Sequence, residues 1–110
     1  MIPALHLALV SALLLATAPA RAQDMPVIKV EMRDGVILPA VIEVPANTRF
    51  KLEISNTGQS PVEFESLELK REKALAAGST SAIIFRTIDP GTYEVFDDFH
   101  PEAKAKLVAK

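Results

Sequence analysis

The chain has 110 residues, of which 49% are hydrophobic and 24% charged, and it contains neither cysteine nor tryptophan. A formal net charge of −2 provides no basic field to hold a phosphate backbone, which argues against nucleic-acid binding. Without cysteine the chain has no disulfide, thiolate metal site or cysteine nucleophile, so any site chemistry must use oxygen atoms or imidazole.

The N-terminal segment, residues 1–22, has the pattern of a secretory signal peptide. An apolar run from Ala4 to Ala18 is followed by Ala20-Arg21-Ala22, whose small residues suit signal peptidase. The run is shorter than the roughly 20 residues that span a bilayer. We therefore predict cleavage after Ala22 and a periplasmic domain of residues 23–110 without stable membrane insertion. Residues 1–3 include no lysine or arginine, so an uncleaved N-terminal anchor is the alternative.

Alternation of apolar and polar residues predicts strands near residues 28–33 and 49–55. Turn residues then separate short apolar segments at close intervals, for example at Asp34-Gly35, Asn56-Thr57-Gly58 and Asp89-Pro90-Gly91. The further expected strands are 37–38, 41–44, 62–65, 67–69, 81–87, 93–96 and 106–108. Regularly punctuated short strands predict one all-β domain, a Greek-key antiparallel β-sandwich.

Two segments have more than one interpretation. Residues 68–77 contain good helix formers, but we expect a strand followed by a loop. Tyr93 follows the turn at residues 89–91, so its hydroxyl can bond to upstream backbone in a tyrosine corner, which is typical of Greek-key sandwiches. A plain hairpin with a half-buried tyrosine is the alternative.

Common enzyme motifs are missing, because the sequence has no GxSxG, P-loop, GxGxxG or HExxH pattern. After the predicted processing, His100 is the single histidine. A Ser-His-Asp hydrolase is disfavoured because small sandwiches rarely provide the cleft that such an enzyme needs.

Candidate ligands gather in two segments. Asp97 and His100 are three residues apart, so a turn after the preceding strand lets both side chains point to the same end of the sandwich. Glu63 and Glu65 flank Phe64, so they face outward together if Phe64 lies in the core. Like charges this close repel each other, and a bound cation or solvent offsets the repulsion. A hydrated acidic rim is therefore the alternative for each pair.

Several segments resemble a known family. Residues 44–48 (VPANT), 56–58 (NTG) and 90–96 (PGTYEVF), the last leading to a loop with a histidine, are similar to cupredoxins over nearly all of residues 27–110. More narrowly, residues 62–66 (VEFES) and 96–101 (FDDFHP) resemble segments of the EfeO-type cupredoxin-like proteins of bacterial iron-uptake systems. The resemblance implies a cupredoxin-like fold and two partners, an inner-membrane iron permease and a periplasmic iron-binding protein.

The sequence departs from blue-copper cupredoxins at the metal ligands. Asp97 stands at the position of their cysteine, and His100 can take the place of the second imidazole. The position of their methionine falls near Ala103 or Lys104, and their upstream histidine is replaced by the region around residues 62–65. We therefore expect no type-1 blue copper site.

Carboxylate and imidazole donors suit ferric iron and also accept Cu(II). We predict that Glu63, Glu65, Asp97 and His100, with Asp98 as a substitute, bind an iron or copper ion. The resemblance implies a role in ferrous iron oxidation, as a ferroxidase component, or in iron transfer to the permease. Two alternatives stay open: a metal-free β-sandwich that binds a protein in the periplasm, and a His100 loop that serves only in packing.

Overall fold

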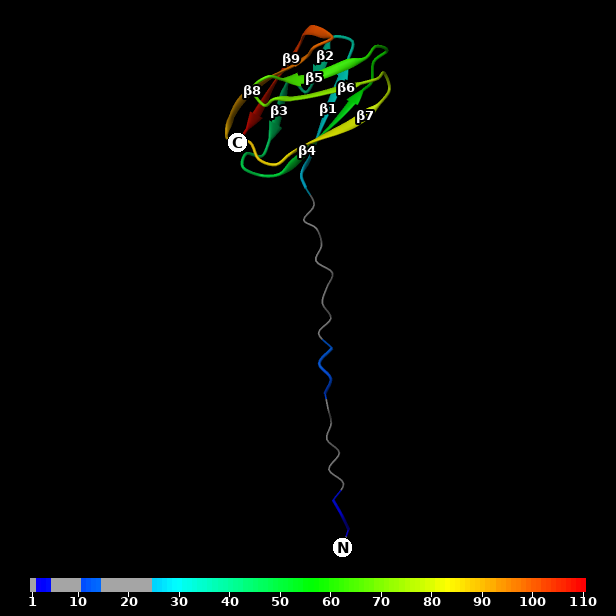
Figure 1. Ribbon diagram of the computed structural model, residues 1–110, viewed down its shortest axis with the longest axis vertical. Helices are drawn as coiled ribbons and strands as arrows, with labels where there is room; N and C mark the ends of the chain where they lie inside the picture. The colour runs from blue at the N-terminus through cyan, green and yellow to red at the C-terminus, as the bar shows by residue number, and fades with distance from the viewer. Residues whose placement is uncertain (1, 5–10, 15–24) are drawn as a thin grey trace.

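The structure, a computed structural model, describes residues 2–4, 11–14 and 25–110. Residues 25–110 form β-strands in two sheets that pack face to face (Figure 1). The described residues contain no helix, and so none that is long and apolar enough to cross a membrane. The predicted signal peptide, residues 1–22, lies largely outside the described residues.

The strands follow one another along the chain with short connections. They are β1 (Val27–Arg33), β2 (Val36–Leu38), β3 (Val41–Val44), β4 (Phe50–Asn56), β5 (Val62–Ser66), β6 (Arg71–Leu75), β7 (Thr80–Phe85), β8 (Gly91–Asp97) and β9 (His100–Ala109). The first sheet has the order β2-β1-β4-β7, and the second sheet has the order β3-β9-β8-β5-β6.

The all-β sandwich is confirmed, but both sheets are mixed where the sequence predicts antiparallel sheets. β1 lies parallel to β4, and β3 lies parallel to β9. β1 and β4 can be parallel because the chain crosses from the first sheet to β3 of the second sheet and then crosses back to form β4. Apolar alternation reports which face of a strand is buried and not the direction of its neighbour, so the sequence pattern could not reveal the parallel pairs.

Apolar side chains from both sheets form the core. In β4, Phe50, Leu52 and Ile54 are fully buried and alternate with half-buried residues, as predicted. Phe50 stacks on Phe85 with the ring centroids 4.9 Å apart, and the Arg71 guanidinium lies 5.0 Å from the centroid of the Phe85 ring. The aromatic contact joins two neighbouring strands, and the cation–π contact connects the edge strand of one sheet to the edge strand of the other.

The first ambiguous segment contains a strand as expected, but the strand predicted at residues 67–69 is wrong, because residues 67–70 form a turn and the strand begins at Arg71. β6 is an edge strand at Arg71–Leu75, so residues 68–77 are a strand with flanking turns and not a helix. The Tyr93 hydroxyl donates a hydrogen bond of 2.7 Å to the Asp89 carbonyl, which confirms the tyrosine corner. This bond anchors the beginning of β8, the strand that ends at Asp97.

Three connections meet at the end of the sandwich that lies away from the C-terminus (Figure 1). They are the β1–β2 turn, the β4–β5 loop and the β8–β9 turn. Side-chain hydrogen bonds link all three, from Asp34 to Ser60 and from Ser60 to His100. We call this region the polar end and define it by Asp34, Asn56, Ser60, Asp97 and His100.

Candidate functional site

Asp97 is the buried carboxylate at the centre of the polar end, with a relative exposure of 2%. Its Oδ1 accepts hydrogen bonds from the backbone N–H groups of Glu63, at 2.9 Å, and Phe99, at 3.0 Å. A register irregularity between Phe96 and Asp97 places Asp97 opposite His100 across the β8–β9 turn. The carboxylate is therefore fixed by backbone on one side and free to bind the imidazole on the other.

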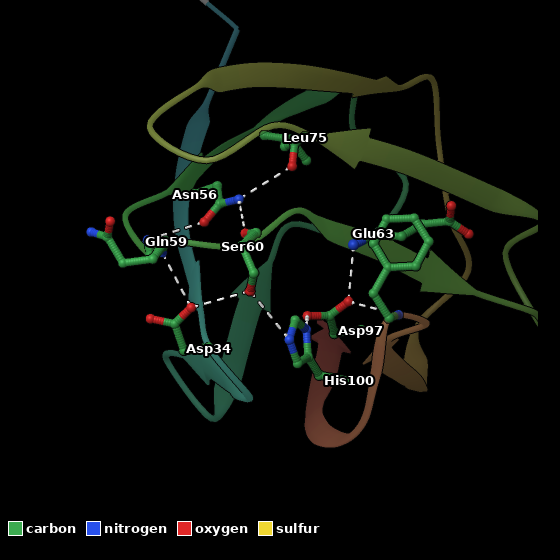
Figure 2. A network of polar contacts seen from close by, with 10 residues as sticks. Asp34, Asn56, Gln59, Ser60, Glu63, Leu75, Asp97 and His100 are labelled. Atoms are coloured by element: carbon green, nitrogen blue, oxygen red, sulfur yellow. Dashed lines mark hydrogen bonds and ion pairs between the residues drawn. The ribbon is translucent and has the colours of Figure 1, made fainter.

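His100 connects Asp97 to the neighbouring loops (Figure 2). Its Nδ1 lies 2.8 Å from Asp97 Oδ2, and its Nε2 lies 3.3 Å from Ser60 Oγ. The side chain is 25% exposed, so one edge of the ring can be reached from solvent. The predicted proximity of Asp97 and His100 is confirmed, and the imidazole is held between a buried carboxylate and a hydroxyl.

Asp34 completes this chain of contacts from the β1–β2 turn. Its Oδ1 accepts hydrogen bonds from the Ser60 hydroxyl and from the Gln59 backbone N–H, each at 3.2 Å. Asp34 has a positive φ of 36°, a backbone conformation that aspartate tolerates better than most residues. A Cβ at Gly58 would lie 2.7 Å from Asp34 Oδ1, so only glycine lets the carboxylate approach the loop this closely.

Asn56 fixes the β4–β5 loop from inside the protein. Its side chain is 1% exposed, and its amide donates to the carbonyls of Ser60, at 2.9 Å, and Leu75, at 3.2 Å. Its Oδ1 accepts the Gly58 N–H at 3.0 Å. All of the amide's hydrogen-bonding groups thus have partners, which sets the position of the Ser60 backbone.

Ser60, His100 and Asp97 stand in the order of a nucleophile, a base and an orienting carboxylate. The Ser60 hydroxyl, however, donates to Asp34 at 3.2 Å. A hydroxyl has one proton, so Asp34 competes with His100 for it. The arrangement is a hydrogen-bonded relay between two carboxylates, and Ser60 is not directed toward His100 alone, as a hydrolase mechanism requires.

Glu63 and Glu65 do not join Asp97 and His100. Val62, Phe64 and Ser66 of β5 are buried, whereas the two glutamates are half-buried on the outer face of the same strand. The Glu63 backbone meets Asp97, but its carboxylate points away from His100 (Figure 2). Neither glutamate points inward, so the sequence-predicted ligands fall into two groups on opposite faces of the sheet.

The outer group gains a third carboxylate. Glu72 of β6 stands directly across from Glu65, and ligand oxygens of Glu63, Glu65 and Glu72 lie within 4.8 Å of one another. None of the ion pairs found among residues 25–110 includes any of the three. We call this group the acidic face.

The acidic face changes the protonation of Glu63. Desolvation raises the pKa of its carboxyl above the ordinary value of 4.5, and the charges of Glu72, Asp98 and Glu65 raise it further. Like charges opposite each other on adjacent strands are also destabilising. A cation bound here would offset both effects.

Sequence reasoning missed Asp34, Ser60 and Glu72. It identified Asp34 only as a turn residue, and it gave Ser60 and Glu72 no role. Their contacts with the predicted residues depend on strand pairing and loop packing, for which the sequence spacing contains no signal.

A family model described as the cupredoxin-like domain matches residues 6–109. An uncharacterised protein of Rickettsia prowazekii (strain Madrid E) is 37% identical over 75 residues, which are 68% of this chain and 60% of that protein. The chain therefore spans less than two thirds of the length of this relative.

Solved structures share the fold. Auracyanin B has a TM-score of 0.66 at 16% identity and covers 80% of this chain and 92% of its own. Auracyanin A of Chloroflexus aurantiacus, a "blue" copper protein, has a TM-score of 0.65 at 15% identity, over 79% of this chain and 100% of its own. Amicyanin of Paracoccus versutus (Thiobacillus versutus) has a TM-score of 0.59 at 21% identity, over 86% and 87%. Identities this low establish the fold alone.

Proposed function

Because the chain belongs to the cupredoxin-like domain family, we propose that it is a periplasmic protein that binds iron or copper at a non-blue site. Its role would be to assist the oxidation of ferrous iron, or to transfer iron between a periplasmic iron-binding protein and a membrane permease. The location follows from the signal-peptide pattern of residues 1–22, the partners follow from the sequence resemblance, and the metal chemistry follows from the carboxylates.

The residues do not fit type-1 blue copper, the metal group that the fold family implies. The chain has no cysteine, and Asp97 at the corresponding position already accepts two backbone N–H groups. Blue sites depend on a soft thiolate, which a carboxylate cannot replace. We therefore derive no blue-copper electron transfer for this protein.

The observation that carries the proposal is the convergence of Glu63, Glu65 and Glu72 on the acidic face. Three carboxylates offer hard oxygen donors, which suit ferric iron. Because such donors favour Fe(III) over Fe(II), they make bound ferrous iron easier to oxidise by an acceptor such as dioxygen. The cluster lies on the surface of β5 and β6, where iron can load and leave, as cargo must.

Equilibrium dialysis of the full chain with Fe(II) under anaerobic conditions, and separately with Cu(II), tests this proposal. Replacing Glu63, Glu65 and Glu72 together by glutamine should weaken iron binding at least about tenfold and slow the oxidation of Fe(II) in air. Glu53→Gln is the matched control, because Glu53 is half-buried on β4 of the other sheet. Equal iron affinity in the triple variant and the control would refute the assignment.

A metal-free protein-binding module is the second candidate, and one observation favours it. Within residues 25–110, every buried side-chain nitrogen or oxygen has a hydrogen-bond partner, including those of Asp97 and Asn56. The polar end is therefore stable without an ion, and the acidic face could meet a basic partner. If EDTA changes neither the melting temperature nor the affinity for a captured partner, this candidate replaces the metal-binding one.

A further inference from the structure

We propose that β3 (Val41–Val44) is a dimerisation edge, at which a second copy of this chain pairs antiparallel and joins the two five-stranded sheets into one. β3 lies at one edge of the second sheet, and the acidic face lies on β5 and β6 at the opposite edge. The dimer does not depend on the proposed function, because the acidic face of each copy stays outside the contact.

The backbone of β3 has an open side. The Ala40 carbonyl accepts the Lys106 N–H of β9 at 2.9 Å, at the start of the parallel ladder between the two strands. Alternate residues of a strand direct their backbone groups to opposite sides, so Val41 and Glu43 turn their N–H and carbonyl groups away from β9. Among residues 25–110, no strand pairs with this side of β3. These groups are therefore ready to pair with another chain.

The other edge strands of the sandwich have features that block such pairing. β6 has the sequence REKAL, in which three residues are charged. Its Arg71 guanidinium donates to the Ile84 carbonyl of β7 at 2.9 Å, which ties the edges of the two sheets together. β2 has only three residues. β3 contains neither lysine nor proline, and its Val41 is 50% exposed. Edge strands are usually protected by charge, proline or shortness, so β3 is the edge suited to a partner.

Two prolines restrict the second copy to one symmetric register. With Val41 opposite Glu43 of the second copy, each such pair exchanges both N–H and carbonyl groups, and the two-fold axis passes through Ile42. A register centred on Val41 would put Glu43 opposite Pro39, and one centred on Glu43 would put Val41 opposite Pro45. Proline has no N–H to donate. The register centred on Glu43 would also set two like charges against each other.

The same register matches the side chains of the two copies. Val41 stands beside Lys106 on the outer face of the sheet. Glu43 of the second copy would lie on the far side of Val41, two strand spacings of about 4.8 Å from Lys106, which the two long side chains can bridge. Lys106 is exposed and has no ion pair within residues 25–110, and the pair that Glu43 makes with Lys110 is exposed as well. The edge is therefore complementary in charge to a second copy of itself.

Sedimentation velocity of the full chain tests the dimer. A short strand pair buries less surface than a standard interface, so we expect a weak dimer with a dissociation constant of roughly 0.1–1 mM. Val41→Lys should weaken association at least about tenfold, because a lysine protects an edge strand and would stand beside Lys106. Val36→Lys is the matched control, since it adds the same charge to a similarly exposed valine on β2, and it should leave association unchanged.

A charge exchange tests the register. Glu43→Lys should weaken association at least about fivefold, because it brings the new lysine toward Lys106 of the second copy, and adding Lys106→Glu to the same chain should restore association. Isotope-filtered NMR of mixed labelled and unlabelled chains should show contacts between Ile42 of one copy and Ile42 of the other.

Three results would overturn the dimer. They are a chain that stays monomeric at the highest concentration of this range, association that persists in Val41→Lys or is lost equally in Val36→Lys, and contacts between copies that do not include Ile42. Iron binding should be equal in Val41→Lys and the wild type. Failure of the dimer would therefore leave the acidic face untouched, and loss of iron binding in the triple glutamate variant would leave the dimer untouched.

Discussion

The polar end and the acidic face both contain carboxylates from distant parts of the chain, but the structure surrounds them differently. At the polar end, the buried Asp97 carboxylate accepts two backbone N–H groups and contacts His100. On the acidic face, three glutamates stand beside one another without an ion pair among the described residues. The first group is satisfied by the protein itself, whereas the second depends on solvent or a cation. Proximity of acidic residues therefore has opposite consequences in the two regions.

The largest expected loss of stability comes from removing the Asp97 carboxylate, which has hydrogen-bond partners on both oxygens. Asp97→Ala leaves two part-buried backbone N–H groups and His100 Nδ1 without their carboxylate partner, which should cost about 2–4 kcal/mol of unfolding free energy. Urea denaturation measures the loss. Glu65→Ala on the acidic face is the contrast, with a change expected within about 0.5 kcal/mol. Similar losses in the two variants would remove the distinction between the regions.

Gly58→Ala tests how closely the loops of the polar end are packed. The new methyl group would meet Asp34 Oδ1 at 2.7 Å, so the carboxylate must move away from Gln59 and Ser60. We expect a loss of about 1 kcal/mol of unfolding free energy, the typical size of a hydrogen bond, measured by urea denaturation. Gly78→Ala is not a suitable control, because the φ of 76° at Gly78 is strained for alanine. Ala76→Gly is the control, because it measures the stability change that a substitution in a loop causes without a clash. Equal stability of Gly58→Ala and Ala76→Gly would contradict the close packing of Asp34 against this loop.

Glu65→Lys tests the repulsion on the acidic face. A lysine directly opposite Glu72 converts a like-charge pair into an opposite-charge pair. The variant should be more stable by roughly 0.2–1 kcal/mol at low salt, and the gain should shrink as salt is added. Thermal melts at two ionic strengths measure it. A destabilised variant would mean that Glu65 makes favourable contacts that outweigh its repulsion by Glu72.

The smallest expected effect is the pH dependence of Glu63. Its pKa in the folded state is raised above the ordinary value of 4.5, so the folded protein holds this proton more tightly than the unfolded chain does. Ionised Glu63 therefore lowers stability at neutral pH, and this cost disappears as the pH falls below 4.5. Glu63→Gln should melt slightly above the wild type at pH 7, and the difference should approach zero in acid. If the difference in melting temperature grew as the pH falls, the pKa of Glu63 would not be raised in the folded protein.

Local sequence pattern predicted most of the fold. Alternation identified the faces of β4 and β5, and the turn before Tyr93 indicated the tyrosine corner. These features depend on residues that are neighbours in the chain, as does the three-residue spacing that brings Asp97 to His100. Local sequence patterns did not predict that β1 is parallel to β4 and β3 is parallel to β9, because parallel pairing depends on crossovers between the sheets.

The sequence by itself determined that this protein has no thiolate ligand, since the chain contains no cysteine, and that carboxylate oxygens are its most numerous donors. It also determined that Glu63 and Glu65 share a face, because strand geometry alternates side chains. Tertiary structure alone decided which groups meet. Pairing of β5 with β6 put Glu72 beside the two glutamates, and the packing of the loops put Ser60 between Asp34 and His100. Contacts across strands and loops follow from the register of the whole sandwich, which short sequence segments do not specify.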